Sequence, residues 1–146
     1  MSRMHKSSRG SSGSSNPVDK KQPDWLDYDE DEVEELVVKL KEEGNDPSQI
    51  GMKLRDEYGI PDVKTVTGKK ITTILEENDA QDELPEDLNN LVEKAENIQD
   101  HLEDNQKDED ADRRLSLVEA KIRRLASYYR DEGRIDDDWE YEREER

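Results

Sequence analysis

The sequence IQDHLEDNQKDEDADRRLSLVEAKIRRLASYYR, residues 98–130, contains the end of one amphipathic helix, an acidic turn and a long basic amphipathic helix. In its second half, apolar residues recur at intervals of three and four, which is the spacing of one helix face. They are Leu115, Val118, Ile122, Leu125 and Tyr129. This pattern predicts a helix from about Asp112 to Glu132, which Gly133 ends.

The charge of this helix is opposite to that of the whole chain. From Arg113 to Arg130 there are six basic residues and one acidic residue, Glu119, in a protein of formal net charge -18. At about 100° per residue, a face adjoining the apolar stripe carries Arg114, Lys121, Arg124 and Tyr128. Arg123 and Arg130 extend the positive surface. Guanidinium groups beside a tyrosine suit contacts to RNA phosphates and bases; the alternative is a solvated charged face.

Four further helices are predicted before this one, at about 29–44, 46–59, 67–78 and 85–102. Asp29 begins the first, with Glu32 at the capping-box position. The second begins at Asp46 and Pro47, Thr67 caps the third, and the residues GIPDV, 59–63, form a turn or an extended link. No stretch alternates with period two, so the chain is predicted to be all-α. Residues 134–146 are acidic and irregular, with Ile135 and Trp139 packing back.

Residues 1–22 are rich in Ser, Gly and basic side chains, with five basic residues against one acidic residue. Such a segment cannot bury apolar surface and is expected to be extended when free. It is either a solvated tail or an arm that orders on nucleic-acid phosphates. A positive arm on a strongly negative protein favours the second interpretation.

The composition limits the core and permits two interpretations of the acidity. With 29% hydrophobic residues and no Phe in 146 residues, the core must be thin and built from Leu, Ile and Val. The acidic surface serves either to bind basic partners or to work in concentrated salt, where self-repulsion is screened. Because the acidic residues are spread over every helix, the salt interpretation is favoured.

Several classes of chemistry are not expected. The absence of cysteine excludes disulfides and thiolate chemistry. His5 and His101 fall in different segments, so neither a metal site nor a cofactor is predicted. No nucleophile–base arrangement is present, and an enzyme is not expected. No apolar run approaches the ~20 residues that span a bilayer, and no apolar signal region begins the chain, so a cytoplasmic protein is expected.

The residues TGKK, 67–70, differ from a nucleotide-binding P-loop, which needs two correctly spaced glycines and a Ser or Thr after the lysine. A helix beginning beside Lys69 and Lys70 would still suit a backbone phosphate. A simple cap with exposed lysines is an equally good interpretation.

The turn and basic helix, with the blocks DEVEELVVKLKEEG, IGMKLRDEYGIPDVK and TGKKITTILEEN, resemble the S-fifteen (S15) family of small-subunit ribosomal proteins. The family signature is a His, an Asp seven residues on, a Ser three beyond that, and an Arg-rich helix with a Tyr. The N-terminal blocks resemble the longer archaeal and eukaryotic form. The likeness covers nearly the whole chain, and the acidic surface suggests a halophilic archaeal homologue.

The resemblance implies roles for residues that match the signature. His101 and Asp108 would recognise the minor groove of a ribosomal RNA helix, while the Ser position holds Ala111. Tyr128 would contact a nearby three-way junction, together with the positive positions Arg113, Lys121 and Arg124. The chain departs from the family at positions that are usually His or basic, which hold Glu109, Asp110, Asp112 and Asp131.

We therefore expect a structural constituent of the small ribosomal subunit that binds ribosomal RNA at a three-way junction and a nearby minor groove, beside neighbouring ribosomal proteins and away from DNA and membranes. The expected RNA-binding residues are His101, Asp108, Arg113, Arg114, Lys121, Arg124 and Tyr128, with Thr67, Gly68, Lys69 and Lys70, and with Arg3, Lys6 and Arg9 in the arm.

The expected organisation is a basic flexible arm (1–22), a two-helix N-terminal domain (23–61), a four-helix RNA-binding domain with the long basic helix (62–133), and an acidic tail (134–146). The alternative function is a salt-adapted helical adaptor that docks an acidic protein on its basic helix.

Overall fold

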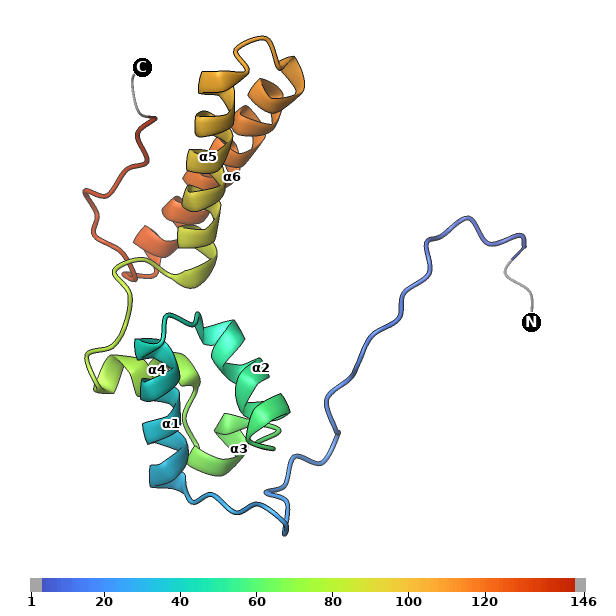
Figure 1. Ribbon diagram of the computed structural model, residues 1–146, viewed down its shortest axis with the longest axis vertical. Helices are drawn as coiled ribbons and strands as arrows, with labels where there is room; N and C mark the ends of the chain where they lie inside the picture. The colour runs from blue at the N-terminus through green and yellow to red at the C-terminus, as the bar shows by residue number, and fades with distance from the viewer. Residues whose placement is uncertain (1–3, 144–146) are drawn as a thin grey trace.

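The computed structural model describes residues 4–143 of the 146-residue chain, and these form six α-helices without a β-strand. In chain order they are α1 (Glu30–Glu42), α2 (Pro47–Glu57), α3 (Val63–Thr67), α4 (Ile71–Glu77), α5 (Glu86–Asp104) and α6 (Glu109–Asp131). Figure 1 shows α1–α4 grouped in one unit, called here the N-terminal unit, and α5 with α6 as an antiparallel hairpin. The prediction of an all-α chain is confirmed.

The N-terminal unit is closed around a small aliphatic core. Val33, Val37 and Leu40 line one face of α1 and pack with buried residues of α2, α3 and α4. The start of α1 follows the predicted capping box: the Asp29 carboxylate accepts the Glu32 N–H at 2.9 Å, and the Glu32 carboxylate accepts the Asp29 N–H at 3.0 Å.

The prediction for residues 59–70 is wrong in two respects. The short helix α3, Val63–Thr67, was not predicted and begins at the last residue of the expected turn or extended link, 59–63; Asp62 caps it by accepting the Lys64 N–H at 3.1 Å. Gly68 ends α3 in the left-handed region, with φ of 72°. Helix α4 begins only at Ile71, so Thr67 ends one helix rather than capping the next.

The hairpin has its own core, built from the stripes that the sequence predicted. On α6, Leu115, Val118 and Ile122 are buried, and Leu125 and Tyr129 pack beside them. The buried residues of α5 are mainly Leu88 and Ala95, with Leu91, Val92, Ile98 and Leu102 partly buried against this core. Helix α6 begins about a turn earlier than predicted, because Asp108 caps it by accepting the Ala111 N–H at 3.0 Å.

Residues 134–143, called here the C-terminal segment, lie along the hairpin (Figure 1). Ile135 is buried and Trp139 is partly buried against the hairpin core, which confirms the prediction for both. Two polar contacts were not foreseen. The buried Gln99 amide donates to the Tyr141 hydroxyl at 2.7 Å, and the Arg143 Nε donates to the Glu119 carboxylate at 2.7 Å.

The two cores divide the chain in the link between α4 and α5. Ile74 and Leu75 of α4 belong to the core of the N-terminal unit. The division of packing therefore does not coincide with the expected boundary after residue 61, because α3 and α4 fold back onto α1 and α2. Polar contacts hold the link and the hairpin to the N-terminal unit: Lys41 forms an ion pair with Asp82 of the link, and the Ser48 N–H donates to the Glu86 carboxylate of α5 at 3.3 Å.

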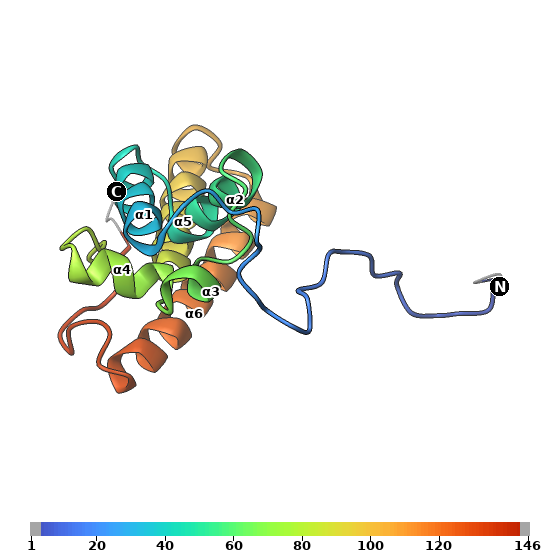
Figure 2. The same cartoon turned by 90° about the horizontal axis from the view of Figure 1, so that it is seen from below.

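The described part of the arm, residues 4–22, has no helix or strand and its side chains are exposed. Figures 1 and 2 both show it projecting away from the helices. The extended conformation expected from its composition is confirmed for these residues.

Candidate nucleic-acid interface

The turn between α5 and α6 brings His101 and Asp108 together. The His101 Nε2 lies 2.9 Å from the Asp108 Oδ2, while the other Asp108 oxygen accepts the Ala111 N–H. The Asn105 amide nitrogen lies 3.5 Å from the His101 Nδ1. This pattern suits the imidazole tautomer with its proton on Nε2, which donates to Asp108 and leaves Nδ1 as an acceptor.

The charge of Asp108 is stabilised by its neighbours. The hydrogen bond from His101, then the Ala111 N–H and the nearby Arg114, hold the pKa of this carboxyl below its usual range. Asp108 is therefore a carboxylate at neutral pH, and it fixes both the first turn of α6 and the orientation of the His101 ring.

A shallow hollow of about 450 Å³ adjoins this pair. Its lining includes Lys94 and Asn97 of α5 and Arg114 of α6, beside His101 and Asp108. Two cations, an amide and an oriented imidazole therefore line one surface together with the carboxylates of Asp108 and Asp110, and this mixed set suits hydrogen bonds to RNA 2′-hydroxyls and base edges. Ala111, at the family's Ser position, also lines the hollow and offers no hydroxyl.

The exposed face of α6 carries four cations without an ion-pair partner among residues 4–143. They are Arg113, Arg114, Lys121 and Arg124, and all four side chains are exposed. Tyr128 on the same face is 56% exposed. The structure thus brings five predicted RNA-binding residues onto one surface that adjoins the hollow at its N-terminal end.

Leu117 is a member of this face that the sequence reasoning missed. Its side chain is 52% exposed. At about 100° per residue it lies between Arg113 and Lys121. The sequence did contain a signal for this position, because Leu117 is an apolar residue outside the i, i+3, i+4 stripe of the helix. An apolar side chain among cations adds a surface for ribose or base contact.

The opposite side of α6 is engaged within the chain. Arg123 lies 3.7 Å from the Glu119 carboxylate, which also pairs with Arg143, and an Arg130 nitrogen donates to the Trp139 carbonyl at 3.3 Å. Arg123 and Arg130 were expected to extend the positive surface. Arg130 instead contacts the C-terminal segment, whereas Arg123 stays exposed and, among the described residues, pairs only with Glu119 of its own helix.

At the far end of the hairpin, Tyr129 connects α6 to α5. Its hydroxyl donates to the Asp87 carboxylate at 2.6 Å, joining the last turns of α6 to the start of α5. Burial and the Asp87 charge raise the pKa of Tyr129 to about 12. The Tyr128 ring packs edge-on against Tyr129, with their centroids 5.3 Å apart. This contact positions Tyr128 on the exposed face.

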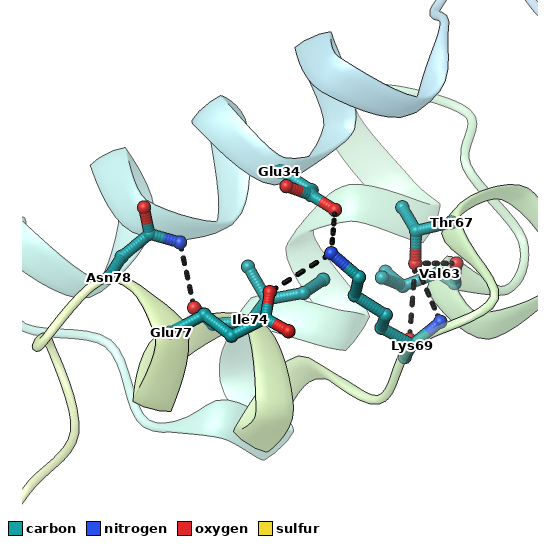
Figure 3. A network of polar contacts seen from close by, with 7 residues as sticks. All are labelled: Glu34, Val63, Thr67, Lys69, Ile74, Glu77 and Asn78. Atoms are coloured by element: carbon teal, nitrogen blue, oxygen red, sulfur yellow. Dashed lines mark hydrogen bonds and ion pairs between the residues drawn. The ribbon is translucent and has the colours of Figure 1, made fainter.

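The TGKK residues lie on the N-terminal unit, and two of their side chains are already engaged (Figure 3). The Thr67 hydroxyl donates to the Val63 carbonyl at 2.8 Å. The Lys69 ammonium pairs with Glu34 at 3.1 Å and Glu77 at 2.9 Å, and these carboxylates raise its pKa. Lys70 remains exposed and without an ion pair in the described chain.

Of the basic residues predicted in the arm, Lys6 and Arg9 are exposed, and Arg3 lies outside the described residues. Within residues 4–143, no group of His, Asp and Glu is arranged to hold a metal ion, and no helix is long and apolar enough to cross a membrane.

Comparison with known proteins connects both parts of the chain to ribosomal families. Residues 1–60 match the Ribosomal S13/S15 N-terminal domain, and residues 70–145 match Ribosomal protein S15. The chain is 52% identical to the small ribosomal subunit protein uS15 of Natronomonas pharaonis, over 99% of this chain and 96% of that protein. It is 54% identical to the protein of that name from Haloquadratum walsbyi, over 97% and 91%, and 46% identical to the one from Schizosaccharomyces pombe, over 97% and 94%.

Proposed function

The chain belongs to the ribosomal protein S15 family, as its sequence motifs predicted, and on this premise we propose that it is a structural constituent of the small ribosomal subunit. In this role it binds small-subunit ribosomal RNA at a three-way junction and at the minor groove of a nearby helix. It lies beside other ribosomal proteins, and it has no catalytic role.

The observation that carries the proposal is the exposed face of α6. Arg113, Lys121 and Arg124 have no intramolecular ion pair within residues 4–143, although acidic residues far outnumber basic ones in the chain. Long cationic side chains left unpaired in such a chain indicate an external polyanion. Tyr128 and Leu117 add apolar surface that a purely solvated face would not need.

The two parts of the interface supply different contacts. The cations of α6 neutralise backbone phosphates, and this contribution positions the protein without reading sequence. The His101–Asp108 pair is oriented before RNA binds, and it suits hydrogen bonding to 2′-hydroxyls and base edges in a shallow minor groove. Specificity therefore comes from the turn and most of the affinity from the helix.

The acidity of the chain fits this function in concentrated salt. Its relatives include proteins of halophilic archaea, which confirms the halophilic character predicted from the composition. Mobile ions screen the repulsion between the acidic surface and RNA beyond about 3 Å at 1 M salt. Contacts made at hydrogen-bond distance persist under these conditions.

A binding titration in molar salt tests the proposal. The full chain is titrated with an RNA that contains the three-way junction, and with a duplex of scrambled sequence. We expect preference for the junction, lost in Asp108→Ala and His101→Ala and kept in the control Glu103→Gln. Equal affinity for both RNAs would contradict junction recognition, and no binding to either would favour the protein adaptor.

If only Arg113→Gln, Lys121→Gln and Arg124→Gln weaken binding, recognition is mainly electrostatic. In that case the turn, with Ala111 in place of Ser, does not perform the family role. Circular dichroism of each variant establishes that the helices are intact.

A further inference from the structure

A second open groove lies on the N-terminal unit and reaches Glu86 at the start of α5; the residues that line it come from outside α6. It has a volume of about 580 Å³ and runs between α2 and the connection from Ile60 through α3 to α4. Its floor is apolar where α2 meets α4: a Cβ on Gly51 would lie 3.4 Å from the Ile71 side chain. Met52 borders the groove and is 56% exposed.

The charged residues of this groove are arranged to favour an anion. Arg55, Lys64 and Lys70 line it, and Lys64 and Lys70 make no ion pair within residues 4–143. Arg55 pairs only with its neighbour Asp56, and both side chains are about half exposed. Such an exposed pair contributes little and is readily exchanged for another anion.

The two acidic residues of the groove are occupied by the chain itself. Asp62 caps α3, accepts the Thr65 hydroxyl at 3.0 Å and pairs with Lys20 at 3.4 Å. The Glu86 carboxylate accepts the Ser48 N–H. Cations are therefore left facing solvent while the carboxylates are engaged, in a chain of net charge -18.

The base of the arm lies at the same groove. Asn16 lines it, and the ion pair between Lys20 and Asp62 holds the arm beside α3. Figure 2 shows the arm leaving the helices near α2 and α3. Lys20 and Lys21 therefore extend the positive surface of the groove onto the arm.

We propose that this groove, with the base of the arm, binds a single strand of RNA at a site separate from the α6 face. Arg55, Lys64 and Lys70 contact phosphates, since a positive groove that follows the backbone is the usual site for single strands, and the exposed Met52 packs against a ribose or base. The inference rests on the proposed function, because the strand would belong to the same ribosomal RNA.

The absence of cysteine in the natural chain allows a direct test. Single variants Met52→Cys, Ser127→Cys and Glu35→Cys each carry a tethered iron chelate and are assembled into small subunits with full-length small-subunit ribosomal RNA. Hydroxyl radicals then cleave RNA near each position. Ser127 reports on the α6 face, and Glu35 is a control on the acidic face of α1.

We expect Met52→Cys to cleave RNA strongly, at nucleotides different from those cleaved from Ser127→Cys, and Glu35→Cys to cleave weakly. Cleavage from Ser127 with none above the Glu35 level from Met52 would overturn the groove and leave the proposed function intact. If position 52 gave no RNA cleavage but a photocrosslink from it reached a protein, the groove would be assigned to a protein partner instead. Absence of cleavage from Ser127 and Met52 alike would overturn both proposals.

Salt dependence provides an independent measurement. For Lys64→Gln/Lys70→Gln, the slope of log K against log salt for full-length ribosomal RNA should fall by about 1 to 2, since each phosphate contact contributes about 0.7 to 0.9. The isolated junction RNA should bind this variant normally. Lys39→Gln/Lys53→Gln, outside the groove on the same unit, is the matched control, and equal slopes for both variants would contradict the inference.

Discussion

Asp108 has two functions at the residue scale, and they depend on each other. One oxygen caps α6 and the other orients His101, so the start of the basic helix and the histidine are held by a single side chain. Because both oxygens are engaged, the carboxylate has less acceptor capacity left for the 2′-hydroxyl and base N–H donors of RNA. His101 and the nearby cations then become the groups that face the nucleic acid.

Tyr129 leads to a prediction about stability at high pH. Its folded pKa of about 12 lies above the ordinary value of 10, so the folded state holds this proton more tightly than the unfolded state. The resulting stabilisation is complete below about pH 10 and is lost as pH rises from about 10 to about 12. We expect the natural chain to lose more stability over this interval than Tyr129→Phe.

Chemical denaturation at pH 9, 10 and 11 in constant salt measures the difference. Near neutral pH, Tyr129→Phe should cost about 1–3 kcal/mol, because a hydrogen bond to a carboxylate is removed. Tyr128→Phe is the control, since the exposed hydroxyl of Tyr128 makes no such contact. Parallel pH profiles for the natural chain and Tyr129→Phe would contradict the role given to Asp87.

At the scale of the element, α6 presents different surfaces to the core, the C-terminal segment and solvent. Leu117 distinguishes the solvent face. Leu117→Ser should leave the unfolding free energy nearly unchanged, because folding buries only part of this half-exposed side chain. The same change should weaken RNA binding, since it removes apolar surface from the face. Leu115→Ala, at a buried position, should instead cost about 2–5 kcal/mol of stability.

Denaturation and RNA titration of the same two variants separate these effects. Unchanged RNA affinity in Leu117→Ser would show that Leu117 is only a tolerated apolar residue on a charged face.

The C-terminal segment gives a second prediction at this scale. Glu119 is 6% exposed and pairs with Arg143 at 2.7 Å and Arg123 at 3.7 Å. Within residues 4–143, Arg143→Gln leaves the buried Glu119 carboxylate with only the more distant Arg123 as a cation, beside the Tyr141 hydroxyl, so it should destabilise the hairpin by about 1–3 kcal/mol. In the double variant Glu119→Gln/Arg143→Gln the uncompensated charge is gone, and part of the stability should return.

The interaction energy from this double-mutant cycle, measured by chemical denaturation, tests the contact. Strictly additive effects would mean that the Glu119–Arg143 pair does not stabilise the segment, which its other contacts then hold.

On the scale of the whole molecule, charge and a thin core act against each other. A net charge of -18 on two small aliphatic cores should make folding depend on screening. The Debye length falls from about 10 Å at 0.1 M to about 3 Å at 1 M salt. Stability of the RNA-free chain should therefore rise steeply with potassium chloride over this range.

Helicity followed by circular dichroism during salt titration measures this dependence, with a neutral osmolyte as the control for effects that do not act through charge. A chain that is fully helical in low-salt buffer without RNA would contradict the prediction.

Most of the helices, and the charge of the candidate site, were readable in the sequence. The stripe from Leu115 to Tyr129 predicted the buried side of α6, because helical period and burial are coupled locally. The capping box at Asp29 marked the start of α1, because its contacts join residues only three positions apart. The family signature named His101 and Asp108 before their contact was known.

Other features were decided only by the tertiary structure, since they depend on contacts between residues far apart in the chain. The short helix α3 forms where Val63 joins the core of the N-terminal unit, and Asp62 and Gly68 set its two ends. Arg130 is engaged because the C-terminal segment returns to its side of α6 and offers the Trp139 carbonyl. The sequence by itself determined which residues are cationic, and packing decided which of them remain open to RNA.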